Sequence, residues 1–307
     1  MVIFDAHCDL LYKLWRNPEI DVNTSNILQT PLQQIRDSGG KIQCFAVFVP
    51  EDVPFTKRFD AALEQISLFY KKVLAENKDI KLVKTKSEIN ELHSNEIGAV
   101  LTLEGCDAIS DDLHKLHIFY ELGVRSVGLT WNYANLVADG AHERRNGGLT
   151  NFGRKLIHRL NEKKLWTDLS HASERSFWEA IEIADYPIAS HSNVYKLCPH
   201  VRNLKDEQIT ALIKKNGMIG ITFVPFFTAS SKHPQIFDLL QHIDYVLSLG
   251  GENHLGLGSD FDGIDETIIG LENYRSYVDL IDALQKRYVE EIVEKIIYKN
   301  FVQHISF

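Results

Sequence analysis

The chain has 307 residues, of which 44% are hydrophobic and 24% charged, as is typical of a globular protein with a substantial core. Its net charge of −9 argues against nucleic acid as a partner, because an acidic surface repels phosphate backbones. The sequence contains no run of about 20 apolar residues and no basic N-terminal segment of the signal-peptide kind, so we expect a cytoplasmic protein without a membrane partner.

Eight short apolar runs are spread along the chain, and each has the length of a strand. They are nearly continuous rather than alternating, which is typical of parallel strands that helices cover on both faces. The runs are Val2–Phe4, Ile42–Phe48, Ala99–Leu103, Val124–Leu129, Trp166–Leu169, Ile188–Ser190, Met218–Val224 and Leu255–Leu257.

Amphipathic segments lie between these runs. We expect helix N-caps at Thr150 and Ser173 and a left-handed helix end at Gly250. Apolar residues at helical spacing predict helices over Thr56–Asn77, Asn151–Lys164, Ile236–Leu249 and Tyr288–Tyr298, the last with Val289 on its apolar face.

The alternation of eight strands with helices predicts a (β/α)8 TIM barrel of the metal-dependent hydrolase type. No linker or repeat divides the chain, so we expect residues 1–307 to form one catalytic domain. Two long connections, Arg16–Gly39 and Asn132–Gly148, are expected over the catalytic face, because strand-to-helix loops build the site of such barrels.

Metal-binding and ionisable side chains follow five of the predicted strands at their carboxyl ends. A barrel brings these ends together on one face, around one axis. The residues are His7 and Asp9 after the first strand, Glu104 after the third, His171 after the fifth, His191 after the sixth, and Asp260 and Asp262 after the eighth.

The residue types suit a pair of metal ions. His7 and Asp9 are two apart on a strand, so both should point to one side and share a zinc ion. Glu104 has two oxygens and can bridge two ions, and His171 and His191 can hold the second ion. A metal pair about 3.5–4 Å apart can hold a bridging hydroxide and polarise a substrate carbonyl.

Asp260 lies in the glycine-rich sequence GLGSDFDG, which allows close approach to the metals. It can take the proton of the attacking water and pass it to the leaving amine, a general acid–base role worth about 10²–10⁴-fold in rate. Asp262 is either a second catalytic carboxylate or, as we prefer, a residue that stabilises the loop.

Seven segments together resemble the renal (membrane) dipeptidase family, the M19 metallopeptidases of the amidohydrolase-like barrels. Amidohydrolases at large open with His-x-His, where this chain has His7-x-Asp9. The segments are FDAHCDLL, LTLEGCDAI, GVRSVGLTWNYAN, LWTDLSHAS, PIASHSNVY, HVRNLKDEQI and GLGSDFDGI, between residues 4 and 264.

The resemblance implies a zinc dipeptidase, with several family members accepting a D-residue at the C-terminal position, and a homodimer. It implies that Asp260 is the acid/base and that Arg202 anchors the substrate carboxylate, for which a guanidinium is well suited. It implies two zinc ions, although other divalent ions fit similar ligands, held by His7, Asp9, Glu104, His171 and His191.

The chain departs from the renal enzyme at two places near the expected site. Trp131 stands where that enzyme has a histidine, so Trp131 and Asn132 (or Tyr133) are expected to supply substrate contacts. The seventh strand reads ITFVPFF, where relatives often have Asn-Phe-Tyr. Both changes alter the pocket and leave the preferred dipeptide open.

Other residues near these motifs have competing interpretations. Cys8 and Cys106 could offer thiolates to zinc, but we prefer packing, with all cysteines reduced. His142 belongs either to a solvated charged loop or to a substrate-contacting lid, and Arg202 could instead pair with Asp206.

The remaining aromatic and histidine residues are interpreted as structural. Phe223, Phe226 and Phe227 are expected in the core and the pocket lining. Surface positions are expected for His93, His114, His117, His158, His233, His242, His254 and His304.

Two alternatives to a dipeptidase are compatible with the same residues. A deacylase or lactam hydrolase acting on N-acyl amino acids could use the same metal pair. A non-catalytic metal-binding barrel is the second alternative, but such proteins usually lose ligands, and each expected ligand is present here.

Overall fold

The computed structural model describes residues 1–231 and 233–307 and contains a closed barrel of eight parallel strands. The eight apolar runs are these eight strands, so the predicted TIM barrel is confirmed. In order around the barrel they are β1 (Ile3–Cys8), β2 (Gly40–Phe48), β4 (Ile97–Glu104), β5 (Val124–Gly128), β6 (Trp166–Asp168), β7 (Pro187–Ala189), β8 (Met218–Ile221) and β9 (Leu255–Leu257).

A short additional strand, β3 (Ile80–Leu82), was not predicted. It pairs only with the first residues of β4, below the point where β5 joins that strand. Because it has three residues, of which Lys81 is exposed, it lacks the continuous apolar pattern of the barrel strands.

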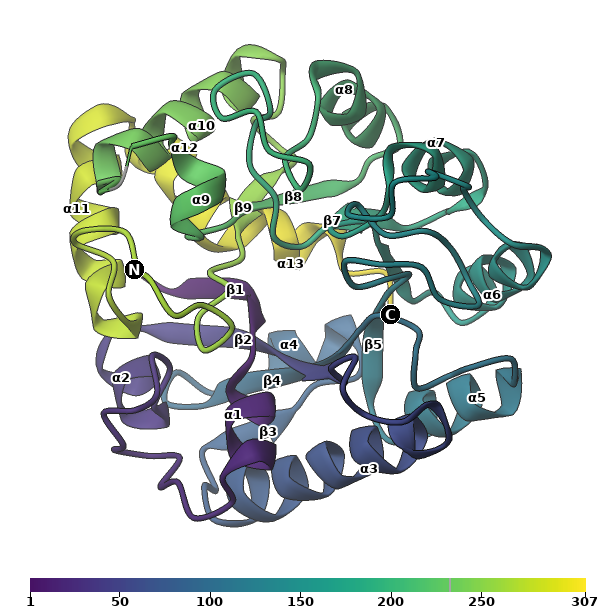
Figure 1. Ribbon diagram of the computed structural model, residues 1–307. Coiled ribbons are helices and arrows are strands. Elements are labelled where there is room, and N and C mark those ends of the chain that lie inside the picture. Colours follow the sequence, from purple (N-terminus) through teal and green to yellow (C-terminus); the bar gives the residue numbers. More distant parts are fainter. Residues whose placement is uncertain (232) are drawn as a thin grey trace.

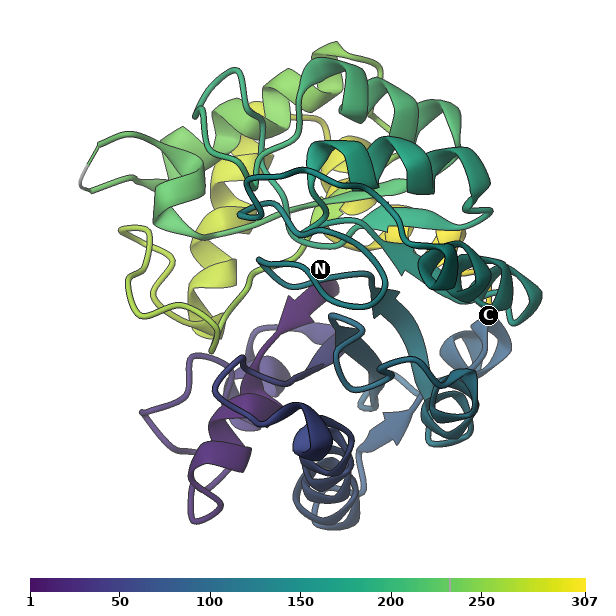
Figure 2. The same ribbon diagram turned by 45° about the vertical axis from the view of Figure 1, so that its right-hand side comes forward.

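Helices surround the barrel in a ring, as Figures 1 and 2 show. They cover the outer face of the strands, which explains why the strand sequences are apolar throughout. The α-helices are α1 (Leu10–Arg16), α2 (Leu32–Asp37), α3 (Arg58–Leu68), α4 (Lys86–Glu91), α5 (Leu113–Glu121), α6 (Asn151–Glu162), α7 (Glu174–Ile183), α8 (Asp206–Lys214), α9 (Pro225–Thr228), α10 (Ile236–Ser248), α11 (Tyr277–Arg287), α12 (Glu290–Glu294) and α13 (Asn300–His304).

The predicted helix ends at α6, α7 and α10 are confirmed. Thr150 accepts a hydrogen bond from the Gly153 amide, Ser173 accepts one from the Ser176 amide, and Gly250 follows α10 with φ of +88°. The two side-chain caps pair amide groups that the first turn of a helix leaves unpaired, and Gly250 has the left-handed conformation that commonly ends a helix.

Two predicted helices are divided into shorter pieces. The segment Thr56–Asn77 consists of a 3₁₀ turn (Phe55–Lys57), α3 and a π-helical stretch (Phe69–Ala75). The segment Tyr288–Tyr298 becomes α12 followed by a second π-helical stretch (Lys295–Lys299). The placement of Val289 on the apolar face was wrong, because this residue precedes α12 and is 69% exposed.

The amino-terminal end of the barrel is closed by packed aromatic side chains. Phe301 of α13 stacks on Phe4 of β1 with ring centroids 4.9 Å apart, and Trp166 of β6 packs against both. Gly256 in β9 is required here, because a Cβ atom would lie 2.4 Å from the Phe301 ring. The opposite end, formed by the carboxyl ends of the strands, is left to build a site.

The barrel is closed by a short seam between its first and last strands. Asp5 of β1 pairs in register with Leu257 of β9. The buried Asp5 carboxylate also accepts hydrogen bonds from the Ser259 amide at 2.8 Å and the Ser259 hydroxyl at 2.7 Å. These side-chain bonds reinforce a junction that has little backbone pairing.

None of the helices in residues 1–231 and 233–307 has the length and apolarity needed to cross a bilayer.

Candidate metal centre

An irregularity in β1 turns His7 toward the barrel interior. Phe4 and Ala6 belong to the interior apolar cluster, whereas Cys8 packs in the layer between strands and helices. This change of side coincides with a register shift between Asp5 and Cys8, as a β-bulge produces. The strand ends at Cys8, so Asp9 precedes α1 and is not the strand residue that the sequence predicted.

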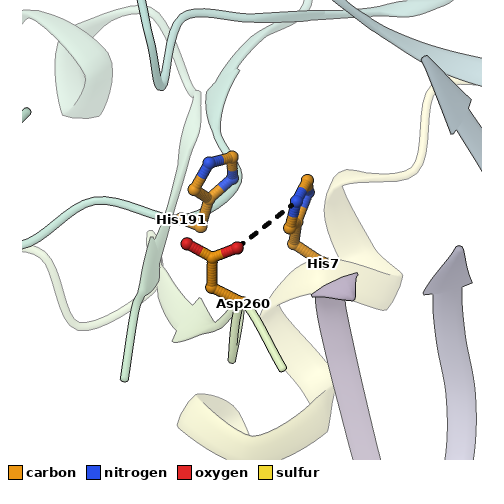
Figure 3. A group of neighbouring side chains, drawn as sticks. All are labelled: His7, His191 and Asp260. Carbon is orange, nitrogen blue, oxygen red and sulfur yellow. Dashed lines mark ion pairs between the residues drawn. The ribbon is translucent and has the colours of Figure 1, made fainter. Parts of the chain in front are cut away.

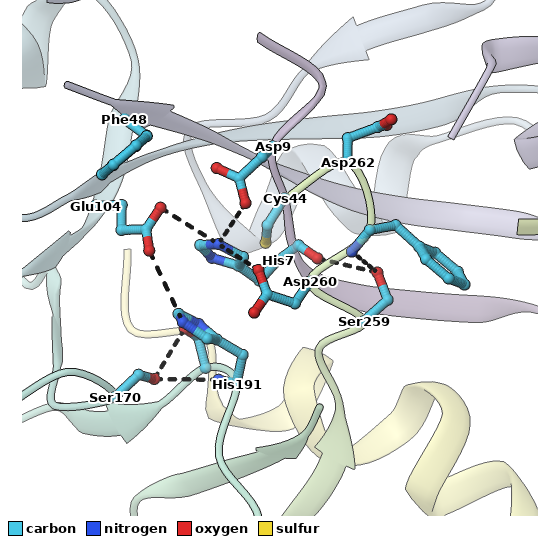
Figure 4. Close-up of polar contacts among 12 residues, drawn as sticks. His7, Asp9, Cys44, Phe48, Glu104, Ser170, His191, Ser259, Asp260 and Asp262 are labelled. Carbon is cyan, nitrogen blue, oxygen red and sulfur yellow. Dashed lines mark hydrogen bonds and ion pairs between the residues drawn. The ribbon is translucent and has the colours of Figure 1, made fainter. Parts of the chain in front are cut away.

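Glu104, the last residue of β4, faces two groups of ligand-type side chains, as Figure 4 shows. Its Oε2 lies 3.6 Å from His7 Nε2, and its Oε1 lies 2.9 Å from His171 Nε2 and 3.9 Å from His191 Nε2. Asp9 Oδ2 lies 3.4 Å from His7 Nε2. The five predicted ligands therefore converge, with Glu104 between the two halves.

Asp260 lies next to this cluster, after β9. Its Oδ1 is 3.7 Å from His7 Nε2, and Figure 3 shows the carboxylate between His7 and His191. Its side chain is 15% exposed, more than those of the five predicted ligands, so it faces the open end of the barrel. A left-handed backbone with φ of +65°, which Asp tolerates better than most residues, sets this orientation.

The donor set fits metal cations. His7 Nε2 and Asp9 Oδ1 are buried without a hydrogen-bond partner, and the Nε2 atoms of His171 and His191 face each other at 2.8 Å. Burial lowers the pKa of both these histidines well below the usual value, which keeps their nitrogen lone pairs available.

The carboxylates at this cluster are buried close to one another, and His7 and Arg202 offset their charge only in part. Burial, followed by repulsion from Glu104, raises the pKa of Asp9 to about 6. Burial likewise raises the pKa of Asp260 to about 7. Three clusters of potential ligands overlap through shared residues: His7, Asp9 and Glu104; Glu104, His171 and His191; and His7, His191 and Asp260. Bound cations would supply the missing positive charge.

The two interior histidines are oriented by hydrogen bonds to their other ring nitrogen. His191 Nδ1 lies 2.7 Å from Ser190 Oγ, which in turn donates to the buried Asp168 carboxylate. His171 Nδ1 lies 3.0 Å from Asn132 Oδ1. Such partners fix the tautomer in which Nε2 is free to bind a metal. Asn132, which was predicted to contact the substrate, therefore also orients His171, a candidate metal ligand.

A cavity of about 490 Å³ opens above the cluster. Arg202 reaches it from the segment after β7 and is only 2% exposed. One guanidinium nitrogen donates to the His191 carbonyl at 3.3 Å, while Nε and Nη1 have no hydrogen-bond partner among the described residues. Burial lowers the Arg202 pKa to about 10, so the group remains cationic at neutral pH.

The structure decides between several of the competing interpretations. Asp206 interacts with Tyr245 and Lys196 rather than with Arg202. His142 is exposed and lines the mouth of the cavity, together with Trp131.

Asp262 stabilises the surrounding loop, which is the interpretation that we preferred from the sequence. The buried Asp262 carboxylate accepts hydrogen bonds from the Gln29 amide at 2.8 Å and from the Thr30 amide at 3.1 Å. The predicted long connection Arg16–Gly39 thus reaches the catalytic face through Gln29 and Thr30. Figure 4 shows the Asp262 side chain turned away from the cluster.

The cysteines pack in the protein interior, and the three phenylalanines lie in the core and the cavity lining, as the sequence predicted. All four cysteines are free thiols; Cys8 is buried in the outer core, and the Cys106 thiol donates to the Gly128 carbonyl. Phe223 is buried, and Phe226 and Phe227 line the cavity.

One histidine assignment was wrong and one cavity histidine was missed. His242 is buried rather than on the surface, since it accepts from the Val194 amide and contacts the Thr228 carbonyl. His200 lines the cavity beside Arg202, and the Arg202 amide donates to its Nδ1 at 3.2 Å. Its position two residues before Arg202, in the motif HVRN, could have indicated that it lines the cavity.

The sequence profile of the membrane dipeptidase family (peptidase family M19) matches residues 1–306. The chain belongs to this family. An uncharacterized dipeptidase of Schizosaccharomyces pombe is 32% identical, and the match covers 93% of this chain and 74% of that protein.

Two solved structures are also similar. A crystal structure described as dipeptidase AC, a metallo peptidase of family M19, has a TM-score of 0.94 and 27% identity, covering 99% of this chain and 98% of the other. A metallo peptidase from Rhodobacter sphaeroides, bound to a phosphinate mimic of the dipeptide L-Ala-D-Ala, has a TM-score of 0.94 and 26% identity over 100% of this chain and 99% of that one. The protein is therefore a metallo-dipeptidase, a hydrolase of peptide bonds that uses a metal cofactor.

The hydrogen-bonded path from Asp168 through Ser190 to His191 leads to a first prediction. Ser190→Ala should weaken metal binding by about 10–100-fold, because His191 loses the partner that fixes its tautomer. Competition with a chromogenic chelator measures this directly. Thr167→Ser, a similarly small change in the adjoining β6, is the control and should leave the affinity unchanged. Equal affinity in Ser190→Ala and wild type would contradict the orienting role.

Proposed function

We propose that the protein is a zinc-dependent dipeptidase with two metal ions. His7 and Asp9 would hold one ion, His171 and His191 the other, and Glu104 would contact both. The observation that carries this proposal is the position of Glu104, whose two oxygens face different histidines. When bound, the ions would polarise the scissile carbonyl and lower the pKa of the attacking water toward ~7.

The chain's own residues would bind the substrate and move the proton. Arg202 has two unpaired guanidinium donors in the cavity, which suit the substrate's terminal carboxylate. Asp260 would take a proton from the attacking water and deliver it to the leaving amine. Asp260 lies beside the cluster, with Oδ1 3.7 Å from His7 Nε2, within reach of a water held there.

We further propose that the enzyme accepts a D-residue at the C-terminal position. The Rhodobacter sphaeroides structure with its L-Ala-D-Ala mimic supports this, because its fold overlies nearly the whole chain. The test is a panel of L,L- and L,D-dipeptides beside N-acyl-D-amino acids, with zinc-reconstituted protein. Faster hydrolysis of the N-acyl compounds than of every dipeptide would favour a deacylase instead.

We also propose that residues 1–307 act as one catalytic domain, in a cytoplasmic homodimer. The four free thiols support a reducing compartment, since disulfides are typical of oxidising ones. Light scattering on the purified protein, with and without zinc, tests the dimer.

Removal of the Arg202 side chain should weaken the binding of dipeptides, which is seen as a higher KM. Arg202→Ala is expected to raise KM for dipeptides by about 10-fold or more, because charge-assisted hydrogen bonds to the carboxylate are lost. Dipeptide amides, which lack that carboxylate, serve as the internal control and should show little change in kcat/KM. A similar loss for dipeptides and their amides would mean that Arg202 supports the fold rather than the substrate.

A further inference from the structure

The two ends of a dipeptide should meet opposite sides of the barrel mouth. Arg202 follows β7, and β2 is the fourth strand from β7 in either direction around the barrel. A dipeptide whose carboxylate is held by Arg202 and whose peptide bond lies over Glu104 therefore extends toward the end of β2. Phe48, the last residue of β2, lines the cavity there.

This side of the cavity is formed by aromatic rings and one lysine. Phe48 packs between Tyr12 of α1 and Trp131, with ring centroids 5.3 Å and 5.1 Å apart. These rings offer an apolar wall to the methylene groups of a side chain. Lys13, the next residue of α1, also lines the cavity.

Lys13 is half-buried, and its ammonium group has no acidic partner of its own. In the residues that the structure describes, it forms neither an ion pair nor a side-chain hydrogen bond. Asp262 forms no ion pair with Lys13 in the described residues, and the Gln29 and Thr30 amides hold its carboxylate in the neighbouring loop.

The other charged residues that line the cavity near β2 in the described part of the chain are acidic, so Lys13 is the cation on the β2 side. Asp9, Glu104 and Asp260 each place an oxygen 3.4–3.7 Å from His7 Nε2, in the ligand cluster. Asp265 is exposed on the rim and forms no ion pair with Lys13 in the described part of the chain. A cation without an ion-pair partner in the described residues, in the same cavity as an apolar wall, suits a side chain that has methylene groups and then a carboxylate.

We propose that Lys13 is a specificity-determining residue that selects dipeptides with an acidic N-terminal residue, L-glutamyl dipeptides above all. The glutamate methylenes lie on Phe48 and Tyr12, and the side-chain carboxylate pairs with the Lys13 ammonium. This inference rests on the proposed dipeptidase function, with Arg202 at the other end of the substrate.

The test compares substrates that differ only in that carboxylate. We measure kcat/KM for L-Glu-L-Ala and L-Gln-L-Ala, and for the same pair with D-Ala, on zinc-reconstituted enzyme. Wild type should prefer Glu over Gln by about 10-fold, as one charge-assisted bond predicts, and the preference should shrink at high salt. Lys13→Met should bring the ratio close to one, because kcat/KM falls more for the glutamyl than for the glutaminyl substrates.

Two further variants complete the design. Lys13→Glu should prefer L-Lys-L-Ala over L-Glu-L-Ala, because the charge at the end of the wall is reversed. Lys155→Met, on the exposed face of α6, is the matched control and should keep the wild-type ratio.

Three outcomes would overturn the inference. They are equal rates for glutamyl and glutaminyl substrates in wild type, an unchanged ratio in Lys13→Met, and an equal loss for both substrates in that variant. If glutaminyl dipeptides are hydrolysed without any preference for Glu, only the role of Lys13 fails. If no dipeptide of the panel is hydrolysed, the proposed function fails with it.

Discussion

Asp260→Asn should keep its metal content and lose about 10²–10⁴-fold in kcat, because the amide cannot accept the proton of the attacking water. Asn has the same shape and also tolerates the left-handed backbone at this position. The measurement is steady-state turnover of a dipeptide beside metal analysis of the same preparation. The loss should appear in kcat more than in KM, since Asp260 acts on the proton rather than on the substrate ends.

Asp262→Asn is the matched control for that experiment. Asp262 has the same left-handed backbone two residues away, but its carboxylate holds the Gln29–Thr30 loop and points away from the cluster. Its replacement should lower the melting temperature and leave kcat within a few fold. Turnover close to wild type in Asp260→Asn, with metal retained, would remove Asp260 from the mechanism.

Glu104→Gln should have the second large effect: if the proposed two-zinc site is correct, metal content should fall from two ions per chain toward one. The amide removes the negative charge and one of the two oxygens that face His7 and His171. Loss of a ligand should exceed the ~10–100-fold loss in affinity typical of outer hydrogen-bond partners. Metal analysis after dialysis measures the stoichiometry, and calorimetric titration measures the affinity.

Asp107→Asn provides the comparison for Glu104→Gln. Asp107 lies three residues later and pairs with Arg58, outside the cluster. This variant should keep two ions per chain. Two zinc ions bound with wild-type affinity in Glu104→Gln would contradict the proposal that Glu104 contacts both.

The strands and their carboxyl ends could be predicted because burial on both faces leaves a simple apolar pattern. That pattern sufficed to place His171 and His191 after adjacent strands, β6 and β7. The orientation of His7 was also correct, but for an incomplete reason. A register shift within β1, not simple alternation up to Asp9, turns it inward, and such a shift depends on pairing with another strand.

Cavity residues on loops and helix surfaces were harder to predict. His200 and Lys13 reach the cavity only because their segments fold over the barrel mouth, which no periodicity in the sequence describes. His242 is different, since it lies three residues after Leu239 on the apolar face of α10. Its burial could have been read from the spacing, had its polarity not suggested the surface.

The seam between β1 and β9 also determines when the site can form during synthesis. His7 and Asp9 leave the ribosome well before Asp260 and the Ser259 that fastens Asp5, which come some 250 positions later. A nascent chain that stops before β9 therefore holds an unclosed barrel that has the five proposed metal ligands but lacks Asp260. Asp260 should thus join the site only when the barrel closes, late in synthesis, because its contacts with β1 are so distant along the chain.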